Sequence, residues 1–264
     1  DATTLKNKVI KLPGGKDILH GEQNYSEGHS AYEWYTYHFV GVDQMTGLSL
    51  YNLDPDKEAT ALANDALVEI NGTKYTTSVS YSKREWAGTA LPSVYGSFGS
   101  QLRWRDLSLS MLMTYSLGGK IYDDAYRALM STASASSASA LHKDVLKSWT
   151  VAPAGMTATS ANRIDPNGIP LLDFNRSIDT NATSSRWLTS ASYLVLKNIT
   201  LTYRLPKPLV TSWGLGGISV KAGIENLFTI TSRKGLNPQF SFNGDSDNTY
   251  VSARVFSFGM ALDF

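Results

Sequence analysis

The sequence predicts an all-β fold, and within that class a segment of a transmembrane antiparallel β-barrel with long extracellular loops. Three observations favour this fold. Several stretches alternate apolar and polar residues with period two, no apolar run approaches the roughly 18 residues of a membrane helix, and short connections alternate with long ones. Because side chains alternate across a strand, each such stretch has one apolar face and one polar face.

Length and composition allow a sizeable core and give no indication of nucleic acid as a partner. The chain has 264 residues, 42% of them hydrophobic and 11% aromatic, which is not the composition of a disordered polypeptide. The 24 Lys and Arg nearly balance the 23 Asp and Glu, so no strongly anionic partner is indicated. Cysteine is absent, which excludes disulfides and thiolate metal sites.

The alternation is clearest in the last fourteen residues, Val251 to Phe264. Large apolar residues predicted to face lipid occupy every second position here: Phe256, Phe258, Met260, Leu262 and Phe264. A soluble sandwich would bury such a face under a second sheet, whereas a transmembrane barrel turns it towards lipid. An aromatic residue at position 264 favours the barrel, because the ends of soluble domains are usually poorly ordered.

Residues 92 to 119 predict a hairpin that turns at Arg105-Asp106. Each strand has about 11 residues, close to the length that a tilted strand needs to cross a bilayer. Trp104 and Tyr115 lie towards strand ends, as interfacial aromatic girdles require. On the second strand, the residues predicted to face lipid are Leu107, Leu109, Met111 and Met113.

Further strands are predicted at 32–42, 193–205 and 218–230, with the end of another inside 1–12. Residues 58–70 predict a short helix and residues 74–81 a short strand, within a loop or small insertion. Counting the hairpin and the last strand, about seven strands would belong to the barrel. That number is too small for closure, because single-chain bacterial barrels begin at about eight strands.

The connections differ systematically in length. Those at 105–106 and 206–216 are short or medium, whereas those at 118–190 and 231–250 are long. Outer-membrane barrels have short periplasmic turns and long extracellular loops. The two long segments are therefore predicted to be extracellular, and Phe264 is predicted to lie at the periplasmic rim.

Several segments resemble the carboxyl-terminal barrel strands of SusC/RagA-type TonB-dependent transporters. The segments that carry the resemblance most specifically are Ser190–Pro206, Gly223–Thr229 and Phe256–Phe264; Asn7–Leu12, Phe39–Asp43 and Tyr115–Tyr122 follow the family in the same order. Together they cover most of the chain.

The resemblance implies an outer-membrane barrel of roughly 22 strands filled by a plug. Such a barrel would lie in the outer membrane of a Gram-negative bacterium and have a SusD-like surface lipoprotein as its lid. Its plug would be pulled by the TonB complex, and its substrates would be glycans or oligopeptides. Nothing in the sequence resembles the family's plug or TonB box, so the chain is interpreted as a carboxyl-terminal third or quarter of a transporter.

Substrate or lid contacts would come from aromatic and arginine side chains in the long loops and the inserted segment. The candidates are Trp86, Trp149, Trp187, Arg127, Arg163 and Arg186. A loop tryptophan more often fixes its own loop, or contacts the lid protein, than it contacts substrate, and that interpretation stays the stronger one for each. Asp245 and Asp247 are weak calcium candidates in a polar run that lacks the closing Glu of an EF-hand loop.

No enzyme motif is present, because the sequence has neither an H-E-x-x-H helix pattern nor a G-x-S-x-G elbow. No catalytic residue and no cofactor are therefore predicted. Two alternatives remain: a soluble β-sandwich that binds carbohydrate, and an outer-membrane pore or enzyme. Solubility without detergent would indicate the sandwich, and conduction without energy coupling would indicate the pore.

Overall fold

The computed structural model describes residues 1–131, 140–246 and 252–264. The chain divides into two compact units. The first comprises residues 1–6, 90–121 and 190–264, and the second comprises residues 7–89 and 122–189. Within the described ranges, no helix is long and apolar enough to cross a membrane.

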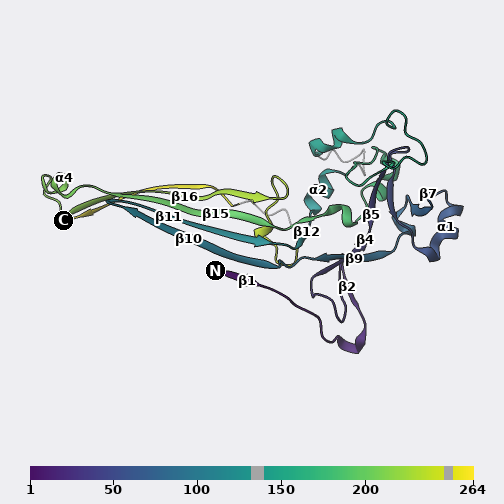
Figure 1. Ribbon diagram of the computed structural model, residues 1–264, viewed down its shortest axis with the longest axis horizontal. Helices are drawn as coiled ribbons and strands as arrows, with labels where there is room; N and C mark the ends of the chain where they lie inside the picture. Colours follow the sequence, from purple (N-terminus) through teal and green to yellow (C-terminus); the bar gives the residue numbers. More distant parts are fainter. Residues whose placement is uncertain (132–139, 247–251) are drawn as a thin grey trace. The chain divides into compact units, whose positions relative to one another are not determined.

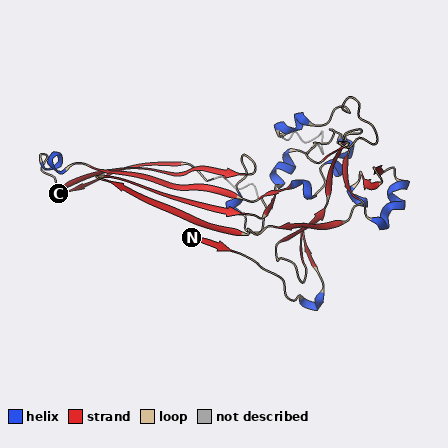
Figure 2. Ribbon diagram, viewed as in Figure 1, coloured by secondary structure: helices blue, strands red, loops and turns tan. Residues whose placement is uncertain are grey.

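The first unit is a six-stranded antiparallel sheet with the order β1-β10-β11-β15-β16-β17 (Figures 1 and 2). Its strands are β1 (Ala2–Thr4), β10 (Val94–Trp104), β11 (Leu107–Leu117), β15 (Tyr193–Arg204), β16 (Gly217–Thr231) and β17 (Val255–Asp263). Helix α4 (Lys207–Thr211) lies between β15 and β16, and the 3-10 turn η7 (Pro238–Phe240) lies between β16 and β17. The predicted hairpin is confirmed, since β10 and β11 have 11 residues each and turn at Arg105-Asp106.

Strand pairing places apolar residues in continuous rows on one face of this sheet, which we call the outer face. Met111 pairs with Ile199, Ile199 with Ile224, and Ile224 with Phe256. The opposite face, called the inner face, has rows of small and polar residues. One such row runs from Ser110 through Thr200 and Gly223 to Ser257.

A bulge on β15 interrupts the pairing. The register shifts between Leu112 and Met113 on β11 and between Leu196 and Asn198 on β15, so Lys197 has no cross-strand partner. A bulge adds a residue to one strand and bends it locally. The alternation within residues 193–205 therefore reverses at Lys197. Residues of the same parity project to opposite faces before and after it.

The second unit contains two small antiparallel sheets, one of order β13-β5-β6-β8-β7 and one of order β2-β3-β4-β9. The strands of the first are β5 (Phe39–Asp43), β6 (Ser49–Asn52), β7 (Leu67–Ile70), β8 (Thr73–Thr76) and β13 (Ile164–Asp165). Those of the second are β2 (Ile18–His20), β3 (Gln23–Tyr25), β4 (Glu33–Tyr37) and β9 (Arg84–Thr89). A short pair, β12 (Lys120–Tyr122) with β14 (Leu188–Ser190), adjoins them in sequence.

Short helices connect these strands. The α-helices are α1 (Glu58–Ala63), α2 (Asp124–Leu129) and α3 (Ser177–Thr180). The 3-10 turns are η1 (Pro13–Gly15), η2 (Pro55–Lys57), η3 (Val79–Tyr81), η4 (Lys143–Lys147), η5 (Phe174–Arg176) and η6 (Ser185–Trp187). A core cluster of Phe39, Val42, Tyr51 and Ala182 draws on both sequence segments of the unit.

Three sequence predictions are corrected in the second unit. The stretch 32–42 is two strands in two sheets, because the chain changes sheet at His38 between β4 and β5. The helix predicted over 58–70 ends at Ala63, since Asp65 adopts a φ of 54°, and β7 follows. The strand predicted over 74–81 ends at Thr76 and is followed by η3.

Candidate functional site

The inner face of the first unit holds a cavity at the end of the strands where the long connections begin. Its volume is about 460 Å³. Tyr95, Ser116 and Tyr193 form one of its walls, and Gln239 and Phe242 of the connection between β16 and β17 form another. Residues 238–242 of this connection lie over the inner face.

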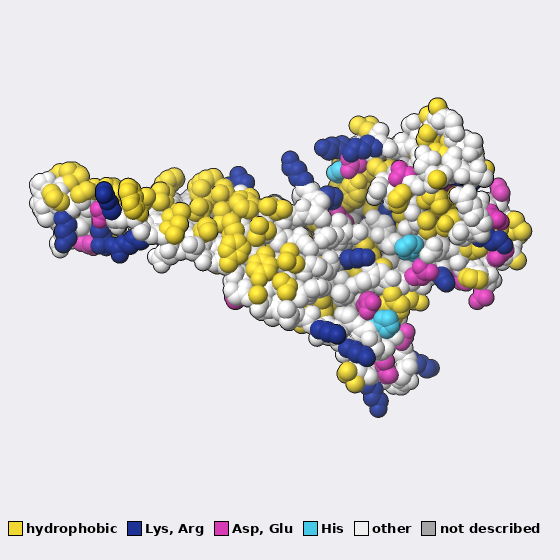
Figure 3. Space-filling model, viewed as in Figure 1, with side chains coloured by type: hydrophobic (Ala, Val, Ile, Leu, Met, Phe, Trp, Pro, Cys, Tyr) yellow, Lys and Arg dark blue, Asp and Glu magenta, His cyan; other side chains and the backbone are white. Residues whose placement is uncertain are grey.

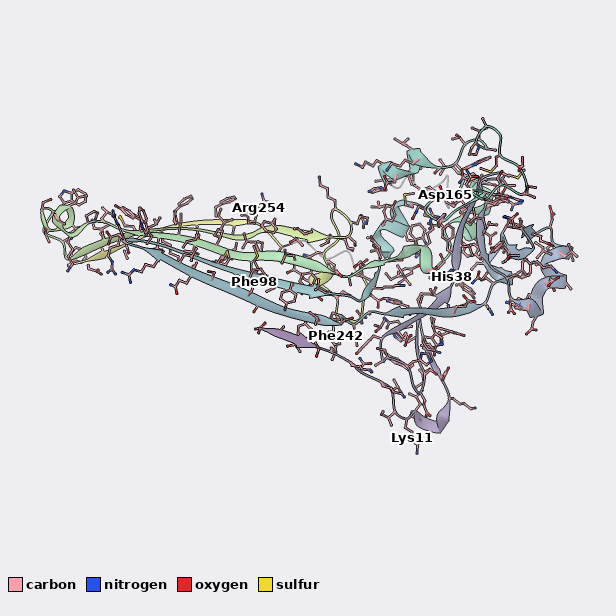
Figure 4. The ribbon with its side chains drawn as sticks, in the orientation of Figure 1. Lys11, His38, Phe98, Asp165, Phe242 and Arg254 are labelled. Atoms are coloured by element: carbon pink, nitrogen blue, oxygen red, sulfur yellow. The ribbon has the colours of Figure 1, made fainter. Side chains whose placement is uncertain are left out.

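Hydrogen bonds fasten that connection to the sheet. Lys197, the bulged residue of β15, donates through Nζ to Oε1 of Gln239. The Gln239 side-chain amide also donates to Oδ1 of Asn237 at 2.9 Å. Ser232 Oγ donates to the carbonyl oxygen of Ser190 at 2.8 Å. Figure 4 shows Phe242 beside the loop end of the long strands and Phe98 further along β10.

In the second unit, Asp43 fixes the turn between β5 and β6. Arg163 donates to both carboxylate oxygens of Asp43, through Nε and Nη2, each at 2.9 Å. The backbone N–H of Met45 and the hydroxyl of Thr46 donate to the same carboxylate at 3.0 and 3.1 Å. Burial raises the pKa of Asp43, but these hydrogen bonds and the Arg163 charge outweigh it, so the pKa lies below its usual range.

Trp149 fastens its own segment to the same turn. Its indole Nε1 donates to the carbonyl oxygen of Gln44 at 2.9 Å. The ring occupies the space that a Cβ on Gly47 would take, and Gly47 has a φ of 73°. Glycine is the residue that adopts this conformation without strain. Trp149 and Arg163 thus both bond to the turn between β5 and β6, and both stabilise the fold there.

Arg186 and Trp187 form a second buried cluster. Trp187 is 2% exposed, and its Nε1 donates to the carbonyl oxygen of Ala182 at 2.8 Å. The Arg186 guanidinium lies over the rings of Trp187 and Phe39, at 4.4 and 5.4 Å. Burial lowers the pKa of Arg186 to about 10, so the side chain stays charged at neutral pH.

The remaining candidates have local partners of their own. Trp86 of β9 stacks on the ring of His29 with centroids 3.8 Å apart. Arg127 of α2 pairs with Asp124 at 2.8 Å. Asp245 accepts from Nδ2 of Asn243 at 2.8 Å, whereas Asp247 lies outside the described residues. Over the part of the chain that the structure describes, no three His, Cys, Asp or Glu residues gather as a metal site.

Sequence reasoning did not single out the cavity residues Tyr95, Tyr193, Gln239 and Phe242. A signal existed for Tyr95, an aromatic residue at a polar-face position of a predicted strand, whereas straight alternation places Tyr193 on the apolar face and only the bulge at Lys197 brings it to the inner face. Gln239 and Phe242 had no such signal. They belong to a segment without periodicity, and only the fold brings it back over the sheet.

The first unit, with long antiparallel strands, one apolar face and one polar face, defines the class as a segment of a large β-barrel. Comparison with known proteins supports the same class. No protein-family model matches the chain. TonB-dependent receptor P3 of Formosa agariphila is 24% identical over 98% of this chain, and TonB-dependent receptor P39 of the same organism is 26% identical over 60% of it.

Solved structures of similar fold include the RagAB peptide transporter, with a TM-score of 0.67, 23% identity and coverage of 98% of this chain. The RagAB peptide importer in its closed-closed state gives a TM-score of 0.68 at 23% identity over 97% of the chain. These matches confirm the predicted resemblance to part of a SusC/RagA-type barrel. The chain spans about a quarter of the length of receptor P3 (26%) and of these RagAB chains (25% and 26%).

Proposed function

We propose that this chain is one part of a TonB-dependent transporter in the outer membrane of a Gram-negative bacterium, where it helps to import oligomeric nutrients. The observation that carries the proposal is the exposed apolar outer face of the first unit. Phe258 is 85% exposed and Met260 65% exposed. Figure 3 shows hydrophobic side chains gathered along these strands, with Lys and Arg at the turn end.

A soluble sandwich does not account for this face. Burial of a large apolar side chain contributes about 1.5–3 kcal/mol, and a sandwich obtains that energy by covering such a face with a second sheet. The first unit has a single sheet, and its outer face is uncovered in the described chain. Lipid is the environment that favours an uncovered apolar face of this breadth.

The two edges of the sheet indicate that further strands complete the barrel. Within the described residues, strand β17 pairs only with β16, and β11 is the only partner of β10 beside residues 98–104. Unpaired backbone groups are costly in a bilayer, so both edges favour pairing with strands from the remainder of the transporter. That remainder would also supply the plug.

In this arrangement the outer-face residues predicted from sequence contact lipid, and the segments 118–190 and 231–250 lie on the extracellular side. A SusD-like lipoprotein would cover that side, and the TonB complex would act through the plug. The substrate would be an oligosaccharide or an oligopeptide, with no nucleic-acid partner. An enzymatic role is not proposed, since the similar proteins are named receptors, transporters and importers.

The test is to extract the protein from its native membrane in mild detergent and identify by mass spectrometry what migrates with it. We expect a larger barrel portion with a plug, together with a lid lipoprotein. Recovery of the chain alone, soluble without detergent, would contradict the proposal. Recovery of the chain from the membrane with a larger barrel portion but without a lid protein would support the barrel and contradict the lid lipoprotein as a partner.

A further inference from the structure

We propose that the cavity on the inner face binds one ring of a neutral oligosaccharide. This inference rests on the proposed function and narrows its substrate class. The cavity is built from one cross-strand row: Tyr95 pairs with Ser116, and Ser116 pairs with Tyr193. Two tyrosines therefore flank a small residue on the same face, in three adjacent strands.

The spacing of this row creates a slot. Neighbouring strands lie about 4.8 Å apart, so Tyr95 and Tyr193 originate roughly 10 Å from one another, with only the serine hydroxymethyl group between them. The connection between β16 and β17 closes one side of the slot with Gln239 and Phe242. The volume of about 460 Å³ lies within the range of small-ligand sites.

The chemistry of the lining favours a neutral ligand. None of the residues that line the cavity is charged at neutral pH. A ligand charge placed there would lose its hydration without gaining an ion pair, which is unfavourable. The nearby Lys197 keeps its charge but does not line the cavity, and its ammonium group points to Oε1 of Gln239.

The lining also favours a ligand that is both hydroxylated and flat on one face. Within the described chain, no side chain or backbone group hydrogen-bonds to the phenol of Tyr95 or of Tyr193, so a ligand can use both. A purely apolar ligand would leave these hydroxyls without partners. Phe242, 68% exposed at the mouth, offers an apolar ring face. A sugar ring combines hydroxyl groups with an apolar C–H face that stacks on such rings.

The experiment uses the full transporter in detergent and measures binding by calorimetry to two panels of probes. One panel consists of unbranched neutral tri- to hexasaccharides, and the other of pentapeptides with and without charged side chains. The variant Ser116→Leu fills the slot while keeping both tyrosines. Its matched control is Ser108→Leu, the same change on the same face of β11 at the other end of the strand.

We expect at least one neutral saccharide to bind, Ser116→Leu to weaken it at least about tenfold, and Ser108→Leu to leave it unchanged. Tyr193→Phe should weaken binding less, because it removes one hydrogen bond, while Tyr203→Phe on the outer face should have no effect. Peptide binding that is sensitive to Ser116→Leu, saccharide binding that is insensitive to it, or no saccharide binding would each overturn the inference. None of these results would alter the particle composition that tests the transporter proposal.

Discussion

At the scale of single residues, the polar and aromatic side chains that stand out in the sequence mostly hold the second unit together. Arg163, Trp149 and Trp187 each bond to groups of their own unit and are engaged before any ligand arrives. The residues better placed to meet a ligand are plainer ones on the inner face, such as Tyr95 and Tyr193.

Removing the Arg163 guanidinium should destabilise the second unit strongly. Asp43 is fully buried, so Arg163→Met leaves a buried carboxylate without its counter-ion, at a cost of about 3–5 kcal/mol. Hydrogen exchange of the intact transporter should show faster exchange around residues 41–48 and 163–168. The control is Arg176→Met, which removes a partly exposed pair with Asp173 at 3.9 Å and should cost below about 1 kcal/mol. Equal effects from the two changes would contradict this account.

Low pH should destabilise the turn between β5 and β6 that Asp43 fixes. The folded-state pKa of Asp43 lies below the unfolded value of 3.8, so the ionised carboxylate stabilises the fold above that value. This contribution diminishes as pH falls below 3.8 and is lost as pH passes the folded-state pKa. Limited proteolysis at a series of pH values should show faster cleavage near residue 45 at the acid end. In Asp43→Asn, cleavage near this residue should already be fast at neutral pH and depend less on pH; an unchanged pH profile would refute the assignment.

At the scale of elements, we expect the outer and inner faces of the long sheet to differ in how well they tolerate a charged substitution. Met111 and Ser110 are neighbours on β11 that project to opposite faces. The pair therefore tests which face meets lipid.

We expect Met111→Arg to destabilise the barrel by about 2–4 kcal/mol, because it places a charge near the bilayer midplane. Ser110→Arg should have a much smaller effect on the hydrated inner face. The measurement is urea-dependent folding of the complete transporter into lipid vesicles. A neutral result for Met111→Arg would count heavily against a membrane location of the outer face.

The long strands could be predicted from sequence because alternation over 11 residues leaves few other interpretations, as β10 and β11 show. The second unit could not be predicted in the same way. Its strands have two to six residues, both faces of β5 are largely buried, and partners such as Asp43 and Arg163 are 120 residues apart. The cavity was missed for a related reason, since a third of its lining, including Gln239 and Phe242, comes from an aperiodic segment.

At the scale of the whole molecule, the described sheet of the first unit has an unpaired edge on each side, and in the proposed transporter strands from the remainder of the protein would close it. The tight, fully hydrogen-bonded state of the complete barrel should resist detergent. Unheated samples of the native transporter should therefore migrate anomalously on SDS gels and shift to the expected mass on boiling. Identical migration with and without heating would contradict closure into a barrel.

The β10–β11 hairpin interrupts the sequence of the second unit, between residues 89 and 122. Its first and last residues, Val94 and Leu117, pair directly. A formed hairpin therefore brings the end of segment 7–89 close to the start of segment 122–189. Before the hairpin forms, the halves are joined by a flexible loop whose closure costs entropy. Assembly of the second unit is thus expected to follow formation of the β10–β11 hairpin.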